Sequence, residues 1–410
     1  MRPKVLLATT CRWIASARLA MAFNLAGCPV DIVCPKGHPA ALINGRGSIY
    51  PYRGLTPLGS FQRAIDAAQP DIVVPCDDLA CRHLHEMHAR ALEDEKNSAL
   101  CQLIERSLGD PSQYPLIDAR YELIALAREL DIKVPETTMI SSVEELRAWI
   151  ANIGLPVALK TDGSSGGLGV RIAYSETEAV RSFGILKAPP KIARAVKRAI
   201  FDQDRTLLIP CLQRRRTAVS IQRFLPFHDA TIAVASWRGE VVASISVEVL
   251  RTWKLKGPAS VVRIIDNREM LSAAQKLVRH LKLSGLCGFD FLVQRETGDA
   301  YLIEMNPRAT QTCHLPLGTA HNLPSALIAC AAGEAKPESA SVTERDVIAL
   351  FPLEWQNDPA SQFLRSGYHD VPWEEPKLVQ ACVKSRMRNG GWLTYDNLDR
   401  MLAHLPWRRS

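Results

Sequence analysis

A lysine followed at once by a glycine-rich loop is the clearest chemical feature of this chain. Lys160 ends a short apolar run, and the loop that follows contains Gly163, Ser164, Ser165, Gly166, Gly167 and Gly169. Glycines let backbone N–H groups turn toward an anion, the serines add hydroxyl donors, and the lysine supplies a point charge. An extended pattern resumes at 170–172. The segment therefore predicts two strands joined by a flap that could cover a phosphate chain.

The loop differs from two better-known phosphate-binding loops. No Gly-Lys-Ser/Thr follows the glycines, and the lysine precedes them, so it is not a P-loop. The segment after the loop is patterned as a strand and not as a helix, so it is not a Rossmann fingerprint. Taken alone, the segment also fits a glycine-rich hairpin on the surface, and its interpretation depends on the rest of the chain.

Two carboxylates and an amide form a second cluster. The segments 288–293 and 301–308 flank the turn at 297–299, which predicts a β-hairpin. Side chains alternate along a strand, so Glu304 and Asn306 share one face of the second strand, and Asp290 lies on the first. Such an all-oxygen site suits Mg²⁺, with Mn²⁺ as an alternative, bridging substrate phosphates. These residues are Asp290, Glu304 and Asn306.

Arg308 follows on the same face of the second strand. There it could hold an anionic group or stabilise transition-state charge. The alternative interpretation is a turn-flanked hairpin with solvated acids. That alternative explains Asp299 well, but it explains Glu304 poorly because Glu304 is embedded in apolar residues.

Together, the two clusters resemble the ATP-grasp superfamily. The flap is similar to the phosphate-covering loop of these enzymes, and 304–308 is similar to their metal- and substrate-binding segment, in the same order and at about the expected spacing. The likeness extends over roughly residues 2–333. Within it, 71–78 looks like the last strand of the preceding domain, 118–124 like the start of a helix that usually carries Asp-Lys, and 220–225 like the hinge whose backbone binds adenine.

The resemblance implies roles for individual residues. Phosphates would bind Arg120, Lys160 and the glycines and serines of the flap, and the implied catalytic residues are Lys160 and Arg308. The residues implied to bind adenine are Gln222, Arg223, Phe224 and Leu225. Two positions depart from the family. Arg120 replaces a lysine and keeps the charge with a different geometry, and Gln222 replaces a glutamate found in many relatives.

The order of elements predicts an α/β protein. Strands and helices alternate in the first part of the chain, which indicates a Rossmann-like parallel sheet; the expected strands cover 4–9, 30–34 and 71–75, and the helices 15–26 and 62–68. Asp77 and Asp78 follow the last strand, where they could serve a ligand or cap the next helix. The expected domains are a Rossmann-like domain (1–110), an ATP-grasp flap subdomain (111–216), an ATP-grasp metal-binding subdomain (217–333) and a C-terminal extension of unassigned role (334–410).

Local patterns predict three further helices. Asp118 is expected to cap a helix over 119–130, the run Ser141–Glu145 is a capping box that opens another helix, and 268–281 is helical. Three histidines, His83, His85 and His88, crowd one segment. Their spacing spreads them around a helix, which favours a surface helix over a metal site. Glu248 could approach the nucleotide or pair with a basic residue on a neighbouring strand.

Composition and charge exclude several classes of protein. The chain is 47% hydrophobic and 23% charged, which excludes bulk disorder, and no apolar run reaches the roughly 18 residues that span a bilayer. The N-terminus lacks a signal-peptide pattern, and eleven cysteines lack Cys-x-x-Cys pairs. A cytoplasmic protein without disulfides is therefore expected.

The net charge of +7 is concentrated between residues 187 and 216, which hold nine Lys/Arg and two Asp. An amphipathic helix is expected over 191–201. A solvated helix face and an electropositive rim that attracts acidic ligands are the favoured interpretations. Nucleic acid or an anionic membrane is a less favoured partner, since no aromatic residues interleave the basic run and no nucleic-acid motif accompanies it.

These observations predict an ATP- and Mg²⁺-dependent ligase. As the resemblance implies, it would activate a small carboxylate as an acylphosphate, join it to an amine or similar nucleophile, and release ADP and phosphate. One alternative is a bicarbonate-activating carboxylase or carbamoyl-phosphate-type enzyme, which is disfavoured because the sequence shows no recognisable biotin-attachment segment or second ATP-grasp half. The other is a non-catalytic nucleotide-binding regulatory module. The predicted partners are the two small-molecule substrates, and a homodimer is compatible with the sequence.

Overall fold

The structure is a computed structural model of the 410-residue chain. It describes residues 2–93, 98–161, 169–188, 217–253 and 257–387. The flap residues from 162 to 168, the helix expected over 191–201 and the arginines at 214–216 lie outside these ranges. Within them, the strands form a four-stranded parallel sheet, a four-stranded antiparallel sheet and a seven-stranded sheet.

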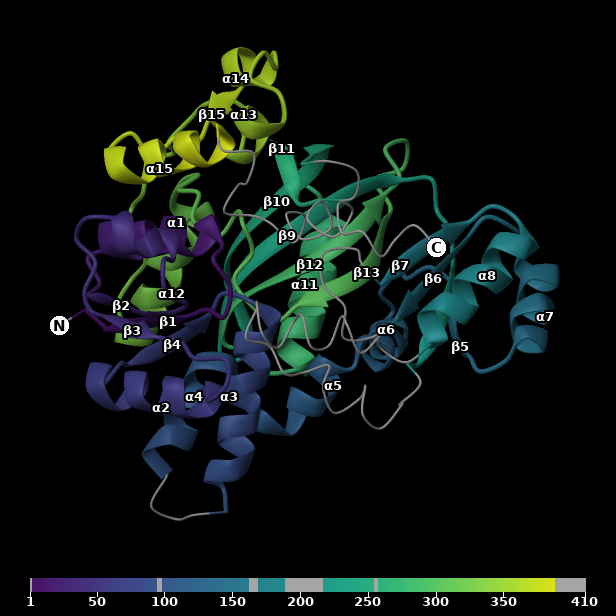
Figure 1. The fold of residues 1–410 in the computed structure, drawn as a ribbon, viewed down its shortest axis with the longest axis horizontal. Helices are drawn as coiled ribbons and strands as arrows, with labels where there is room; N and C mark the ends of the chain where they lie inside the picture. Colours follow the sequence, from purple (N-terminus) through teal and green to yellow (C-terminus); the bar gives the residue numbers. More distant parts are fainter. Residues whose placement is uncertain (1, 94–97, 162–168, 189–216, 254–256, 388–410) are drawn as a thin grey trace, which may run out of the picture.

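The N-terminal sheet has the strand order β3-β2-β1-β4, and its pairs are parallel. Its strands are β1 (Val5–Ala8), β2 (Val30–Cys34), β3 (Ile49–Pro51) and β4 (Ile72–Pro75). Its helices are α1 (Ile14–Leu25), α2 (Pro57–Ala68), α3 (Asp78–Ala91) and α4 (Ser98–Leu108), with the 3-10 turn η1 at Pro39–Leu42. Helix α1 covers one face, and α2, α3 and α4 cover the other (Figure 1). Both faces are buried, which explains the continuous apolar runs of β1 and β4. The parallel Rossmann-like arrangement is confirmed.

The second sheet, called the lid sheet here, is antiparallel and has the order β5-β8-β6-β7. Its strands are β5 (Thr137–Ile140), β6 (Val157–Thr161), β7 (Val170–Ala173) and β8 (Val219–Arg223). Helices α7 (Val143–Ile153) and α8 (Glu176–Lys187) pack on one of its faces, and α5 (Tyr114–Asp118) and α6 (Arg120–Glu129) lead into it after the turn η3 (Pro111–Gln113). The two strands predicted on either side of residues 162–168 are confirmed by the antiparallel pairing of β6 with β7.

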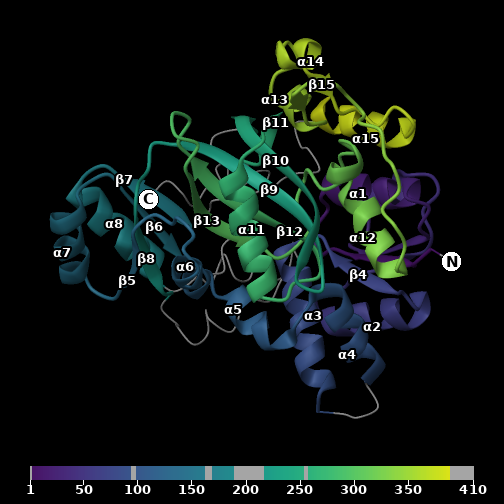
Figure 2. The ribbon, with the colours of Figure 1, turned by 180° about the vertical axis from the view of Figure 1, so that it is seen from behind.

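The seven-stranded sheet, called the central sheet here, has the order β13-β12-β9-β10-β11-β14-β15. Its main strands are β9 (His228–Trp237), β10 (Glu240–Thr252), β11 (Ala259–Ile264), β12 (Gly285–Val293) and β13 (Ala300–Asn306). Helix α11 (Arg268–His280) packs on one face, and α12 (Leu323–Ala332), after the turn η4 (Thr319–His321), packs on the other (Figure 2). The predicted hairpin of β12 and β13 and the predicted helix at 268–281 are confirmed.

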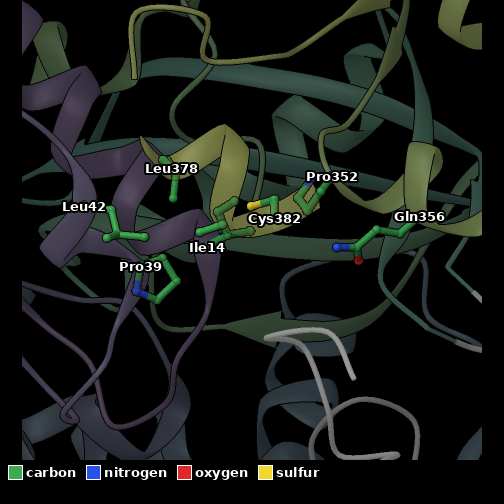
Figure 3. Close-up of a pocket in the computed structure, with 8 residues that line it drawn as sticks. Ile14, Pro39, Leu42, Pro352, Gln356, Leu378 and Cys382 are labelled. Atoms are coloured by element: carbon green, nitrogen blue, oxygen red, sulfur yellow. The ribbon is translucent and has the colours of Figure 1, made fainter. Parts of the chain in front are cut away.

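The C-terminal part of the chain extends this sheet. Strand β14 (Val347–Ala349) pairs antiparallel with β11, and β15 (Tyr368–His369) pairs parallel with β14. Its helices are α13 (Leu353–Asn357), α14 (Phe363–Ser366) and α15 (Pro376–Met387). Helix α15 packs beside α1, where Ile14, Pro39, Leu378 and Cys382 line a pocket of about 10 Å³ (Figure 3). That volume holds one water molecule at most, so the pocket is a packing gap and not a ligand site.

Two local predictions are wrong. Asp118 does not cap α6, whose N-cap is Ala119 without a side-chain bond; Asp118 instead ends α5 and contacts His85 at 3.1 Å. The histidines of α3 are not on a surface helix, because His83, His85 and His88 are 8%, 8% and 2% exposed. Each ring has a polar partner from another part of the chain, which allows this side of a polar helix to be buried. The partners are Tyr52 for His83, Asp118 for His85 and Glu105 for His88.

The predicted capping box is confirmed. Ser142 accepts a hydrogen bond from the Glu145 backbone N–H at 3.1 Å, and the Glu145 carboxylate accepts one from the Ser141 N–H at 2.7 Å. Every cysteine in the part of the chain that the structure describes is a free thiol. No helix in the described ranges is long and apolar enough to cross a membrane.

A close backbone approach joins the N-terminal sheet domain to the central sheet. Gly109 has a φ of +101°, and a Cβ at this position would lie 2.2 Å from the Lys282 carbonyl oxygen. We expect Gly109→Ala to lower the free energy of unfolding by roughly 2–4 kcal/mol, because it adds left-handed strain to a steric clash. Chemical denaturation measures this change. The control is Gly184→Ala in α8, which meets no atom within 4 Å and should be neutral or slightly stabilising. Equal midpoints for Gly109→Ala and the unmodified chain would contradict the assignment of a rigid junction.

Candidate active site

The lid sheet presents two chemically different faces. Val157, Leu159 and Ile221 point toward α7 and α8 and are fully buried. Because side chains alternate, Ala158 and Lys160 of β6 point to the other face. Their register partners on β8 are Gln222 and Ser220, so these four side chains share that face. Lys160 and the expected adenine segment are therefore neighbours on one surface of the sheet.

Lys160 carries a perturbed charge. Burial lowers the pKa of its ammonium to about 8, and the nearby carboxylate of Glu304 counteracts part of that effect. In the part of the chain that the structure describes, the ammonium has no hydrogen-bond or ion-pair partner. A largely desolvated cation without a partner is poised to bind an anion, because a new ionic partner would compensate its desolvation.

The predicted oxygen site lies on the β12–β13 hairpin of the central sheet. Asp290 and Glu304 are direct register partners, and the Asn306 amide donates to Asp290 at 2.9 Å. Burial, followed by the like charge of Glu304, raises the pKa of Asp290 to about 6. A divalent cation bound between these two carboxylates would reduce the repulsion between them. Asp290, Glu304 and Asn306 are thus brought together, as the alternation predicted.

The donor set fits a magnesium ion that keeps further ligands. In the described ranges, no group of three or more His, Cys, Asp or Glu side chains could hold a metal ion. Two carboxylates and one amide oxygen are too few for a closed site. They match Mg²⁺, which retains waters and takes substrate phosphate oxygens as ligands.

Arg120 links the lid sheet to this hairpin. Its guanidinium forms an ion pair with Glu304 and donates to the Thr161 carbonyl oxygen at 3.3 Å. Thr161 follows Lys160 directly, and Glu304 is a predicted metal ligand, so Arg120 connects the two predicted clusters. Arg120 thus lies near Lys160 and binds a carboxylate in this structure, and its predicted contact with phosphate stays a prediction.

Arg308 is held by the N-terminal domain. Its Nε donates to Asp78 at 2.9 Å, and its Nη2 donates to the Asn306 side-chain oxygen at 3.1 Å. Burial alone would raise the pKa of Asp78, but Arg308 outweighs it and holds that pKa below its ordinary value. The Trp13 ring lies 5.7 Å from the guanidinium carbon, close enough for a cation–π contact. Arg308 is thus fixed in orientation at the carboxyl end of β4.

Asp77 and Asp78 divide the two roles that were left open. Asp77 caps α3 by accepting from the Ala80 N–H at 2.9 Å, and it also accepts from the Thr9 and Thr10 hydroxyls at 2.9 and 2.8 Å. Asp78 instead pairs with Arg308. The acid that caps the helix thus also orders the loop after β1, and its neighbour faces the site.

The predicted adenine segment lies at the far end of the same lid-sheet face. Gln222 is buried and donates to the Thr137 hydroxyl at 2.9 Å, which locks the end of β8 to β5. Arg223 is paired with Glu136 at 3.1 Å and is exposed. Phe224 contacts Tyr174 with ring centroids 6.4 Å apart, and Leu225 follows it. Gly169 is buried at the start of β7, whereas the other flap glycines and serines lie outside the described residues.

Glu248 is not part of the site. It pairs with Ala230, whose side chain belongs to the α11 face of the central sheet, so it points away from Asp290. Its carboxylate accepts from Arg295 at 2.8 Å and from Arg263, its partner across β10 and β11, at 3.5 Å. The interpretation as a partner of basic residues is correct.

The sequence interpretation missed Trp13 and the pairing of Asp78 with Arg308. Asp78 and Arg308 are 230 positions apart in the chain. The available signal was the rule that polar residues at the carboxyl ends of parallel strands gather at one edge. That rule placed Asp78 at the edge, but it names no partner.

Part of the chain is similar in sequence to known ATP-binding proteins. Residues 119–319 match the family model described as carbamoyl-phosphate synthase L chain, ATP binding domain. The carbamoyl phosphate synthase large chain of Methanothermobacter thermautotrophicus is 26% identical over 188 residues, 46% of this chain and 16% of that protein. The corresponding protein of Acidobacterium capsulatum is 24% identical over 296 residues, 68% of this chain and 23% of that protein. The chain thus spans less than a quarter of the length of these relatives.

Solved structures agree on the fold. The N5-carboxyaminoimidazole ribonucleotide synthetase of Thermus thermophilus aligns with a TM-score of 0.57 at 14% identity and covers 82% of this chain and 80% of its own. The biotin carboxylase domain of the Hydrogenobacter thermophilus 2-oxoglutarate carboxylase, solved as a dimer with MgADP and bicarbonate, aligns with a TM-score of 0.56 at 16% identity over 83% of this chain and 72% of its own. The chain has the ATP-grasp fold, and its residues 119–319 are similar to the ATP-binding domain that the family model describes. The predicted α/β ATP-grasp fold is confirmed.

The Lys160 charge predicts a pH dependence of nucleotide binding. Its lowered pKa means that the ammonium is present below pH 8 and is lost as the pH rises above about 8. The dissociation constant of a non-hydrolysable ATP analogue should therefore be flat up to that point and rise roughly tenfold per pH unit above it. Calorimetry between pH 6.5 and 9.5 measures the profile. Lys160→Arg stays protonated and should remove the rise, whereas a flat wild-type profile would show that Lys160 does not contact the phosphates.

Proposed function

We propose that this protein is an ATP- and Mg²⁺-dependent, ADP-forming ligase that activates a small carboxylate as an acylphosphate and joins it to an amine or similar nucleophile. The observation that carries the proposal is the opposition of charges where the lid sheet meets the β12–β13 hairpin. Lys160 and Arg120 lie on one side, and Glu304 and Asp290 lie on the other. Triphosphate with its metal is the ligand whose charges alternate in the same way.

Within this proposal each residue has a defined task. ATP phosphates would bind Lys160 and would displace Glu304 from Arg120, which frees the Glu304 carboxylate for the metal. Asp290, Glu304 and Asn306 would hold Mg²⁺, which neutralises charge that develops on the transferred phosphoryl group. Gly169 and the flap loop would cover the phosphates. The segment 222–225 would bind adenine through its backbone.

Arg308 would act where the substrate carboxylate binds, which is the acceptor of the terminal phosphoryl group in this scheme. Held by Asp78, it is oriented in advance to stabilise charge on the phosphoryl group or on the attacking carboxylate. No side chain forms a covalent bond in this scheme, because the carboxylate attacks the terminal phosphate and the nucleophile then displaces phosphate from the acylphosphate. The protein supplies position and fixed charge.

The domain boundaries follow from the same assignment. We propose a Rossmann-like domain at 1–110, a flap subdomain at 111–216, a metal-binding subdomain at 217–333 and a C-terminal part at 334–410. Three sheets and the segments between them support this division. A cytoplasmic location is proposed from the free thiols, and a homodimer from the dimeric biotin carboxylase domain.

A second candidate is the activation of bicarbonate in place of an organic acid. It is favoured by the similarity to carbamoyl phosphate synthases and by the bicarbonate bound in the similar biotin carboxylase domain. Release of ADP from ATP and Mg²⁺ in carbonate-free buffer, with and without added bicarbonate, separates the two. Pooled carboxylates and amines, scored for new mass peaks, then identify the organic substrates. AMP as the main product would contradict both candidates.

Glu304→Gln tests the metal assignment. The substitution keeps size but removes the charge, so turnover should fall by at least about 100-fold and binding of the ATP analogue should lose most of its Mg²⁺ dependence. The matched control is Glu248→Gln, the same substitution on the opposite face of the same sheet, which should leave turnover within about twofold. Turnover of Glu304→Gln at the wild-type rate would show that the metal lies elsewhere.

A further inference from the structure

The C-terminal segment, residues 334–387, contributes three buried carboxylates. Glu354, Asp370 and Glu375 are 0%, 2% and 5% exposed. A carboxylate is costly to bury unless it is paired and hydrogen-bonded. The contacts of each acid therefore show which earlier part of the chain it holds.

Asp370 connects α1 with the segment that follows Arg308. It forms an ion pair with Arg18 of α1 and accepts a hydrogen bond from Nε2 of His314 at 2.7 Å. Burial alone would raise the pKa of Asp370, but His314 and Arg18 outweigh it and hold that pKa below its ordinary value. The ionised acid is acceptor-only, so it fixes both the orientation of the His314 ring and the nitrogen that carries the proton.

Glu354 holds the start of β11 to the end of β10. Its carboxylate accepts from Arg251 at 2.8 Å and from the Ser260 hydroxyl at 2.7 Å. These two residues lie at the end of β10 and at the start of β11. The Gln311 amide donates to the Ala259 carbonyl oxygen at 2.9 Å, so the start of β11 is also tied to the segment after Arg308.

The segment 309–316 lies against the candidate active site. The Ala309 N–H donates to the Pro75 carbonyl oxygen at 3.0 Å, at the carboxyl end of β4. Thr310 lies over β12 so closely that a Cβ on Gly288 would come within 2.5 Å of its methyl group. The segment thus continues directly from Arg308 and passes over the strand that carries Asp290.

We propose that Asp370 and Glu354 are positioning residues for the acceptor side of the active site. Asp370 acts through His314 on the segment 309–316, and Glu354 acts through Ser260 on the start of β11, which Gln311 ties to that segment. The inference rests on the proposed function, because the segment 309–316 would line the binding site of the acceptor carboxylate. In this account the C-terminal segment is a working part of the ligase, and acceptor turnover depends on it while ATP binding does not.

Glu375 supplies a matched control within the same segment. Its carboxylate accepts two hydrogen bonds from the Asn44 N–H, at 2.8 and 2.9 Å, and one from the Asn44 amide at 3.0 Å. It is buried like the other two acids, but among the described residues its hydrogen bonds go to Asn44 and not to 309–316 or to the start of β11. A purely structural effect of losing a buried carboxylate should therefore appear in Glu375→Gln as well.

The experiment compares Asp370→Asn and Glu354→Gln with Glu375→Gln in the full chain. Amide exchange of 309–316 should rise roughly tenfold in Asp370→Asn and stay within about twofold in Glu375→Gln. With the substrates found by the pooled screen, kcat should fall roughly tenfold or more in both test variants, because small misplacements are costly. Binding of the ATP analogue should stay within about twofold of wild type in all three. If Asp370→Asn does not fold, His314→Asn removes the same contact from the other side.

Several outcomes would overturn the proposal. Exchange and kcat that change equally in the test variants and in Glu375→Gln would make all three acids structural anchors only. Faster exchange of 309–316 with unchanged kcat would show that the segment does not position the acceptor. A wild-type chain that forms no product with any pool would instead refute the proposed function, and unchanged exchange in Asp370→Asn would then separately refute the contact.

Discussion

The opposition of charges between β6 and the β12–β13 hairpin is the constraint on which the rest of the structure depends. Lys160 is desolvated and without a partner in the described ranges, and Asp290 is forced toward protonation by burial and by Glu304. Neither condition is favourable for folding, since each costs free energy in the absence of a ligand. Such costs are found where a site is prepared for a charged ligand.

The three sheets determine where these charged side chains point. The apolar face of the lid sheet packs on α7 and α8, which directs Lys160 outward. The α11 face of the central sheet is filled by Phe289 and Phe291, which directs Asp290 to the opposite side. The N-terminal domain adds Asp78, which fixes Arg308. Each of these placements follows from alternation along a strand whose other face is buried.

Alternation also explains what the sequence could predict. Glu304 and Asn306 were expected on one face of a strand with Asp290 beside them, and the structure brings them together. Lys160 next to a glycine-rich turn was equally local. The elements that were predicted, such as β2 and α11, have strong apolar periodicity or clear caps.

What could not be predicted depends on contacts between distant parts of the chain. The burial of His83, His85 and His88 requires polar partners from three other elements, and no local pattern shows them. Asp118 looks like a helix cap, but a tertiary contact with His85 outweighs its local preference. The strands β14 and β15 are three and two residues long, too short for periodicity, and they form only because β11 offers an edge.

The central claim is that a substrate carboxylate attacks the terminal phosphate of ATP. Transfer of 18O tests it most directly, by mass spectrometry of the phosphate released from a carboxylate substrate labelled in both oxygens. The account predicts ADP together with phosphate that carries one label per turnover, because one carboxylate oxygen remains on phosphorus when the nucleophile displaces it. Label recovered in AMP, or ADP formed with unlabelled phosphate, would contradict the account.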